Sequence, residues 1–234
     1  MEDKKRDRTQ GIALGFLAGY VDALGFIALF GLFTAHVTGN FILIGAGLAS
    51  PVPNSGQTLL LKLLVFPAFV IGVGIVPLLS SWAKTRNKRP LPLAFGVQLV
   101  FLAAFMLLGM AAMPLGSEPS HLAMAGGLCG AAGMGVHSGI SRLLLTQLAP
   151  TQMMTGNVTQ VVIDVVAYLR GERGAGFSAS CAKFAWPVAA FGLGAISAAF
   201  AWHAVGFIGL LLPLLILAGL IRMALAAPVV VAAA

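Results

Sequence analysis

The chain has 234 residues, of which 59% are hydrophobic and only 9% charged, and its net charge is +7. A soluble globular protein carries roughly 25% charged residues, and a chain of this size must expose most of its residues to water, so this composition excludes a soluble globular protein. The basic residues stand in short clusters between long apolar stretches, where they orient a chain in a membrane rather than bind nucleic acid. We therefore predict an all-α integral membrane protein whose partner is the lipid bilayer and not nucleic acid.

The apolar stretches predict six full-length transmembrane helices, because a helix needs about 20 apolar residues to cross the hydrocarbon core. In chain order these lie at about 11–32, 58–82, 91–113, 121–144, 182–202 and 204–225. Residues 1–10 precede them as a basic tail. Two further apolar segments, 37–49 and 154–168, are shorter, and we predict that they form re-entrant or half-length helices.

Both short segments open with the same tripeptide, Thr-Gly-Asn, at residues 38–40 and 155–157. The two copies stand 117 residues apart, which is half of the 234-residue chain. In each half, one long segment precedes the tripeptide and two long segments follow it. This matching order predicts an internal repeat within a single membrane domain, with 11–113 as the first repeat and 121–225 as the second.

Loop cations predict how the chain is threaded. The N-terminal tail, the loop 84–89 and the region 170–183 carry cations and mark the cytoplasmic side, whereas the loop 114–120 carries none. If both short segments enter and leave on one side, every basic region falls inside, and the two halves have opposite orientations. The alternative is eight full spans, which places the tail and the region 170–183 outside. We expect the inverted repeat, with a cytoplasmic N-terminus.

Glycines recur at a spacing that suits helix packing. Gly11, Gly15 and Gly19 stand four residues apart, and glycines are also frequent in the segment 121–144. Small residues let helices approach closely, so we predict close helix crossings at both places. A dimer face is the alternative interpretation.

The Gly-Tyr-Val-Asp motif at 19–22 and the His-Val-Thr-Gly-Asn motif at 36–40, echoed at 155–157, resemble the YoaK-like family of uncharacterised bacterial multi-pass membrane proteins. The resemblance extends from about residue 11 to residue 222. It implies a location in the bacterial inner (plasma) membrane. The family is a domain of unknown function, so the resemblance implies no activity and no substrate.

Asp22 is the most informative single residue, because it falls in the middle of the first predicted helix. An ionisable group at that depth costs about 3 kcal/mol on insertion scales, so it faces a polar cavity or a partner. The functional interpretation is a carboxylate that binds a proton or a cation. The structural interpretation is a carboxyl that hydrogen-bonds to a broken helix beside a Thr-Gly-Asn turn.

The two tripeptides are the second candidate site. Threonine and asparagine cap helix N-termini, and glycine permits unusual backbone angles. Helix N-termini carry partial positive charge, and inverted repeats bring two of them together near the membrane midplane. Tight packing of two capped short helices is the alternative. The candidate pathway residues are Asp22, His36, Thr38, Gly39, Asn40, Thr155, Gly156 and Asn157.

Three further residues are secondary candidates: His137, Ser138 and Asp164. A histidine can relay protons, although a hydrogen-bonded structural histidine is the alternative interpretation of His36 and His137. Asp164 either lies inside the membrane as a second acid or lies near its surface beside the arginines at 170 and 173.

These patterns predict a transporter or channel for a small solute, with optional proton coupling through Asp22. The alternative function is a non-transporting membrane scaffold or regulatory subunit. The chain has no Gly-x-Ser-x-Gly, His-Glu-x-x-His or P-loop motif, and its histidines lack metal-ligand spacing, so we expect no enzyme, cofactor or metal site. The substrate, the choice between channel and carrier, and the formation of homo-oligomers stay open at this point.

Overall fold

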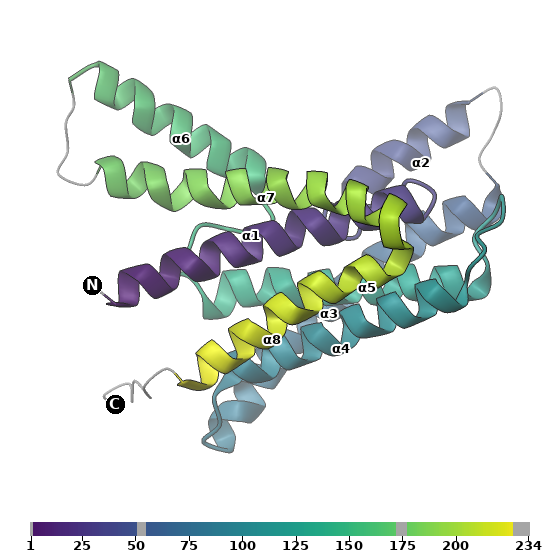
Figure 1. Cartoon of the computed structure of the whole chain (residues 1–234), viewed down its shortest axis with the longest axis horizontal. Coiled ribbons are helices and arrows are strands. Elements are labelled where there is room, and N and C mark those ends of the chain that lie inside the picture. Colours follow the sequence, from purple (N-terminus) through teal and green to yellow (C-terminus); the bar gives the residue numbers. More distant parts are fainter. Residues whose placement is uncertain (1, 51–54, 172–176, 227–234) are drawn as a thin grey trace.

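The computed structural model describes residues 2–50, 55–171 and 177–226, and every regular element in these ranges is a helix. Figure 1 shows a bundle of long helices from which two shorter helices diverge. The helices are α1 (Glu2–Ala28), α2 (Gly39–Ala49), α3 (Gly56–Thr85), α4 (Pro90–Ala111), α5 (His121–Gly139), α6 (Met154–Leu169), α7 (Phe177–Val205) and α8 (Leu211–Ala226). A π-helical turn, η1 (Ile140–Leu144), extends α5, and a 3-10 turn, η2 (Gly206–Leu210), joins α7 to α8. The predicted all-α fold is confirmed, and each predicted apolar segment corresponds to one α-helix, although α1 already begins within the predicted basic tail at residues 1–10.

Several of these helices suit a membrane. Within the described ranges, four helical stretches are long and apolar enough to cross one: Lys4–Ala28, Gly56–Thr85, Pro90–Ala111 and Ser180–Ala226. The last of these contains both α7 and α8, which meet at a bend where Gly206 has a φ of 60°. α5 is not among them, because glycines and two histidines lower its hydropathy. The chain is therefore a membrane-embedded protein with several apolar helices.

The composition of α5 follows from its place in the bundle. α3 and α4 both lie against it, and most of its residues are buried. A helix enclosed by other helices needs small residues for close packing more than it needs a lipid-facing apolar surface. Phe105 and Leu102 of α4 lie directly against Gly130 and Gly133 of α5, so large side chains fill the space that the glycines leave.

α1 and α7 cross so closely that both helices require glycine at the contact. A Cβ atom added at Gly19 would lie closer than 3.0 Å to the carbonyl oxygen of Phe191. One added at Gly194 would come equally close to the carbonyl oxygen of Phe16. Real Cβ atoms essentially never approach backbone atoms to this distance. The close packing predicted for Gly19 is thus confirmed.

α3 and α5 cross in the same way. A Cβ atom at Gly72 would lie closer than 3.0 Å to the carbonyl oxygen of Ala132, and one at Gly135 would do the same with Phe69. Each of the two crossings therefore uses at least one glycine from each helix, set against a backbone carbonyl of its partner, and Gly15 adds a second from α1 against a carbonyl oxygen of α7.

The two short helices lie on different neighbours. α2 has 11 residues and lies against α3, whereas α6 has 16 residues and lies against α7. Figure 1 shows them diverging from the bundle toward opposite ends of the molecule. The connection between α1 and α2 turns back on itself, so that the backbone N–H groups of Thr34 and Ala35 reach Asp22 in the interior of α1. α2 consequently begins beside the interior of α1 rather than beyond its end.

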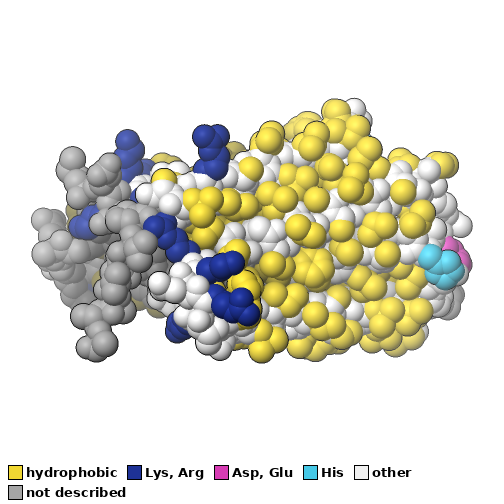
Figure 2. Space-filling view, turned by 90° about the horizontal axis from the view of Figure 1, so that it is seen from below, with side chains coloured by type: hydrophobic (Ala, Val, Ile, Leu, Met, Phe, Trp, Pro, Cys, Tyr) yellow, Lys and Arg dark blue, Asp and Glu magenta, His cyan; other side chains and the backbone are white. Residues whose placement is uncertain are grey.

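Charge is distributed unevenly along the bundle. Figure 2 shows the lysine and arginine side chains gathered toward one end of the molecule, a broad hydrophobic surface next to them, and an acidic and a histidine side chain at the opposite end. The start of α1, the turn between α3 and α4 and the end of α8 all lie at the same end of the bundle in Figure 1. The molecule thus has one basic end and one apolar middle.

Candidate functional site

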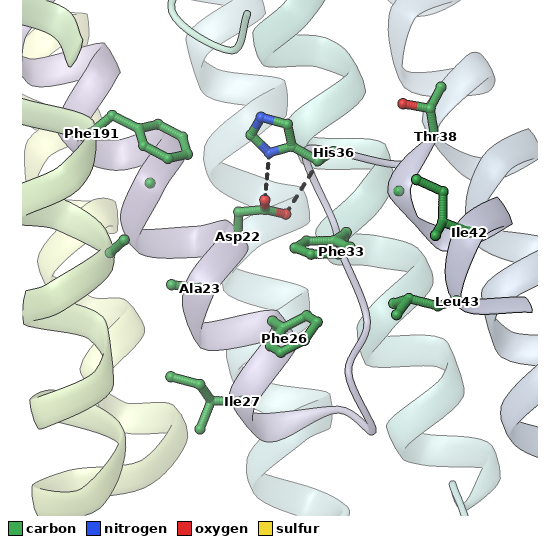
Figure 3. A pocket seen from close by; sticks show the side chains of 13 residues that line it. Asp22, Ala23, Phe26, Ile27, Phe33, His36, Thr38, Ile42, Leu43 and Phe191 are labelled. Atoms are coloured by element: carbon green, nitrogen blue, oxygen red, sulfur yellow. Dashed lines mark hydrogen bonds and ion pairs between the residues drawn. The ribbon is translucent and has the colours of Figure 1, made fainter. Parts of the chain in front are cut away.

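Asp22, which is buried, and His36, which is partly exposed, form a pair between α1 and the connection that follows it. The carboxylate Oδ2 atom lies 2.6 Å from the imidazole Nδ1 atom. The other carboxylate oxygen, Oδ1, accepts hydrogen bonds from the backbone N–H groups of Thr34, at 2.8 Å, and Ala35, at 2.6 Å. Figure 3 shows the imidazole and the carboxylate facing each other across this gap. One side chain of α1 therefore binds both the backbone and a side chain of the connection.

The local backbone explains why an acidic residue stands inside an apolar helix. Residues 32–36 belong to no helix and no strand, so their N–H groups lack the partners that a regular element supplies. A buried N–H group without a partner costs about 1–3 kcal/mol, and a membrane offers it no water. Asp22, which is 4% exposed, satisfies two such groups. This geometry agrees with the structural interpretation of Asp22.

The same pair also forms part of the wall of a cavity of about 810 Å³ between α1, α2 and α7. The His36 side chain is 40% exposed, whereas the Asp22 side chain is 5% exposed. The imidazole is therefore the ionisable group that faces the cavity, and the carboxylate supports it from behind. Thr38 and Gly39 of the first tripeptide complete the polar part of the wall.

The rest of the cavity wall is apolar and rich in aromatic rings. Phe26 and Ile27 of α1 and Ile42 of α2 all belong to this wall (Figure 3). The Phe191 ring stands edge-on to the His36 imidazole, with their centroids 5.6 Å apart. Phe26 and Ile27 are each 38% exposed and Ile42 is 75% exposed, so this part of the wall borders the outer surface of the bundle. The cavity can thus hold an apolar body with one polar group directed at His36.

The two tripeptide asparagines make matching hydrogen bonds. The Asn40 side chain donates to the carbonyl oxygen of Phe33 at 2.8 Å and accepts from its N–H group at 3.0 Å. The Asn157 side chain donates to the carbonyl oxygen of Pro150 at 2.6 Å. In both cases the partner stands seven residues earlier in the chain. Pro150 has no N–H group to donate, which explains why the second asparagine lacks the reciprocal bond.

The predicted capping role of the tripeptides is wrong. Thr38 stands just before α2 but makes no side-chain cap, and α6 begins at Met154, so Thr155 lies inside the helix. An asparagine amide offers both a donor and an acceptor. It can therefore hydrogen-bond to the connection that precedes each helix and hold that connection in place. The side chain that matters structurally in each tripeptide is therefore the asparagine.

The predicted meeting of the two tripeptides is also wrong. Among the described residues, α2 and α6 make no contact with each other, because α2 lies against α3 and α6 against α7. Thr155 and Gly156 are exposed, and a Cβ atom added at Gly156 would meet nothing within 4 Å. Only the first tripeptide lines the cavity beside Asp22.

His137 lies at the centre of a second, fully enclosed polar cluster. Its Nδ1 atom lies 3.0 Å from Nε2 of Gln98, and its Nε2 atom lies 2.8 Å from Oγ1 of Thr151. The N–H group of Thr151 in turn donates to Oγ of Ser141 at 3.4 Å. Ser138 is half-buried, and it is Ser141 that joins the cluster. Gln98 and Thr151 were missed by the sequence reasoning, although Gln98 is the one polar residue within the apolar segment 91–113.

The two polar clusters meet at Gln152. The His36 ring lies close enough to the Gln152 backbone to be influenced by it electrostatically, and Gln152 follows Thr151, the partner of His137. The Gln152 side chain donates to the carbonyl oxygen of Met134 at 2.8 Å, which fixes the residue against α5. The connections before α2 and α6 therefore meet in the interior, although the helices themselves do not.

Asp164 and Lys62 hold helices together. The Asp164 carboxylate accepts hydrogen bonds from Gln160 and from Ser180, both at 2.8 Å, and so joins α6 to α7. Lys62 was not predicted as a site residue, yet it is buried and its ammonium donates to the carbonyl oxygen of Phe30 at 2.8 Å. A cation near the end of a helix binds carbonyl groups that have no partner there, so Lys62 stabilises the end of α1.

Among the described residues, no group of three or more His, Cys, Asp or Glu side chains is placed to hold a metal ion.

Comparison with known proteins places the chain in a family without an assigned activity. A family model described as "Protein of unknown function (DUF1275)" matches residues 10–223, which agrees with the YoaK-like resemblance. Neither the curated proteins nor the solved structures give a match.

Proposed function

The chain belongs to the DUF1275 family of proteins of unknown function, and we propose that it is a transporter or channel for a small solute in the bacterial inner membrane. The cavity of about 810 Å³ between α1, α2 and α7 is the solute site. The observation that carries this proposal is the composition of its wall. A histidine backed by an aspartate faces a space otherwise bounded mostly by apolar side chains.

Proton coupling follows from the same pair. Histidine is the side chain that changes protonation near neutral pH, and Asp22 Oδ2 holds one of its ring nitrogens at 2.6 Å. A solute group that binds the imidazole competes with a proton for the same site. Movement of the solute and movement of a proton are then linked, and Asp22 acts by orienting the imidazole.

The threading that we propose has six spans and two re-entrant segments, each formed by a connection and the short helix after it. Several observations support it. α2 begins beside the interior of α1 and runs outward, and α2 and α6 are too short to span the membrane. The basic side chains gather at one end of the bundle, which is the distribution of a cytoplasmic face (Figure 2). The N-terminus is then cytoplasmic.

An inverted repeat underlies this threading in our proposal. The two close crossings support it. In the two repeats α1 corresponds to α5 and α3 corresponds to α7. The α1–α7 crossing in one half-to-half contact is therefore matched by the α5–α3 crossing in the other. The asparagines support it too, since Asn40 and Asn157 each bind the residue seven positions earlier. The wall of the cavity is where the halves differ, because the position of His36 in the first repeat is taken by Met153 in the second.

Transport can be tested with purified protein in liposomes that contain a pH-sensitive dye. The liposomes are exposed to a panel of short-chain amines, carboxylates and alcohols, and solute entry is followed by light scattering while the dye follows protons. We expect at least one solute class to enter faster than in protein-free liposomes, and His36→Gln to reduce that difference at least roughly tenfold. Asp164→Asn is the control, because Asp164 lies outside the cavity wall. Equal entry with and without protein for the whole panel would contradict the proposal.

The non-transporting scaffold is the second candidate, and the hydrogen bonds of Asp22 to Thr34 and Ala35 favour it. In a scaffold, Asp22 serves only to hold the connection, and His36 has no separate role. The two functions differ in what His36→Gln changes. A transporter loses flux while the fold survives, whereas a scaffold shows no flux in the wild type or in the variant.

A further inference from the structure

A second cavity, of about 380 Å³, lies between the first turns of α1, the beginning of α7 and the connection after α5. Three of the side chains in its wall are cations, Lys4, Arg8 and Lys183, and one is a carboxylate, Asp7. We call this cavity the basic pocket. It lies apart from the solute cavity, with which it shares no lining residue.

The cations of the basic pocket lack a partner of opposite charge. Within the described part of the chain, none of Lys4, Arg8 and Lys183 forms an ion pair. Asp7 is the one carboxylate in the wall, and its Oδ1 atom accepts a hydrogen bond at 3.4 Å from Gln147, which also lines the pocket. Three cations and one carboxylate leave the wall with a net charge of +2. Like charges gathered around one small space repel each other and attract an anion into it. The net positive charge of the pocket wall therefore favours the binding of an anionic ligand.

Arg8 is already held in place for such a ligand. Its guanidinium group lies over the indole ring of Trp186, 4.6 Å from the ring centroid. A guanidinium held by an aromatic ring keeps its N–H donors free at the edge. Trp186 is 45% exposed on α7, where an indole suits the boundary between membrane and water.

Apart from Gln147, the remaining wall of the basic pocket is apolar and includes Leu148, Ala149, Ala182 and Pro187. A freely soluble anion would gain nothing from these side chains, whereas an amphiphile would bury apolar surface on them. The pocket also lies at the basic end of the bundle, which faces the headgroups of one leaflet in the proposed threading. Basic pockets between transmembrane helices at such a position suit lipid headgroups.

We propose that the basic pocket binds the phosphodiester headgroup of an anionic phospholipid from the surrounding bilayer. The ammonium groups of Lys4 and Lys183 contact the phosphate oxygens, and Arg8 donates from its fixed position on Trp186. The glycerol and the first methylene groups lie on the apolar wall. The lipid then joins the first turns of α1 to α7, at a position in α1 that precedes the glycine crossing at Gly19.

Native mass spectrometry of the purified full chain tests this site. Dioleoyl-phosphatidylglycerol is titrated against wild type, against the double variant Lys4→Gln/Lys183→Gln, and against the control Arg86→Gln/Lys88→Gln. The control removes the same charge from the same end of the bundle but outside the pocket. All four residues are exposed, so the variants should fold. Because each cation near anionic lipid contributes roughly fivefold in affinity, we expect the pocket variant, which lacks two, to bind roughly 25-fold more weakly and the control to bind nearly as wild type.

Three outcomes would overturn the proposal. Equal weakening in both double variants would mean that only the overall surface charge attracts the lipid. Equal binding of dioleoyl-phosphatidylcholine and dioleoyl-phosphatidylglycerol by the wild type would remove the charge requirement. Displacement of the lipid by glycerol 3-phosphate at a similar concentration would assign the pocket to a soluble phosphate. Selective loss in the pocket variant, with no displacement by glycerol 3-phosphate, supports the lipid site.

Discussion

The Nδ1 atom of His36 lies 2.6 Å from the Oδ2 atom of Asp22, so the connection after α1 is bound to a residue of α1 that stands 14 positions earlier. This contact therefore belongs both to the structural support of the connection and to the wall of the cavity. On one side the carboxylate fixes a backbone that has no regular structure, and on the other side the imidazole faces a cavity. Substitutions at the two residues should therefore have different effects on stability and on transport.

Asp22→Ala should destabilise the fold, because it leaves the N–H groups of Thr34 and Ala35 without their buried acceptor. Two unsatisfied groups cost about 2–6 kcal/mol together. Asp22→Asn keeps an acceptor oxygen and should unfold at a temperature closer to that of the wild type. Thermal unfolding in detergent measures both variants, and equal melting temperatures for all three proteins would contradict the anchoring role.

His36→Gln should preserve the fold and impair transport. The His36 side chain is 40% exposed to the cavity, so its replacement removes little packing. It does remove the imidazole as a hydrogen-bond partner for the solute. A hydrogen bond in which one group is charged is worth about 1.5–3 kcal/mol, which corresponds to at least roughly tenfold in solute affinity. Solute entry into liposomes should fall by that factor while the melting temperature stays within a few degrees. A large loss of melting temperature would instead place His36 in the folding core.

Asn40→Ala should destabilise the protein more than Asn157→Ala does. Asn40 both donates to and accepts from Phe33, whereas Asn157 donates to Pro150 and, weakly, to the sulfur of Met154. With a net value of about 1 kcal/mol for each hydrogen bond, the expected losses are about 2 and about 1 kcal/mol. Unfolding in increasing concentrations of denaturing detergent gives the order. The reverse order would show that the two connections are not held by these bonds.

Gly194→Ala and Gly192→Ala form a matched pair on α7. A Cβ atom at position 194 would meet the backbone of Phe16 in α1, whereas one at position 192 would meet nothing within 4 Å. The first change should cost about 1–3 kcal/mol through overpacking, and the second should be neutral or slightly stabilising, since alanine favours helices. Melting temperatures in detergent separate the two. Similar losses at both positions would indicate that helix separation is not what the glycine provides.

Labelling of single cysteines separates six spans from eight. In a background that lacks Cys129 and Cys181, cysteines are introduced at Lys84, Ser117 and Leu169 and treated with a membrane-impermeant maleimide. Re-entrant short segments place positions 84 and 169 on the same side, with position 117 opposite. Eight spans place 84 and 169 on opposite sides, and that pattern would contradict the proposed threading.

The sequence alone determined the class of the protein and the order of its helices. Apolar length and loop charge are local properties of the chain, so the eight segments could be located before any contact was known. An acid in the middle of an apolar helix and a repeated tripeptide also singled out Asp22, His36, Thr38 and Gly39, which line one cavity.

Only the tertiary structure decided which polar groups meet. It separated α2 from α6, replaced threonine capping by asparagine bonds, and gave His137 the partners Gln98 and Thr151. It also placed Lys62 at the end of α1. These outcomes depend on how closely residues far apart in the chain approach one another. Hydropathy and motif spacing do not contain the distances between such residues. Those distances are set on folding, by the glycine crossings and by the turn that brings His36 back to Asp22.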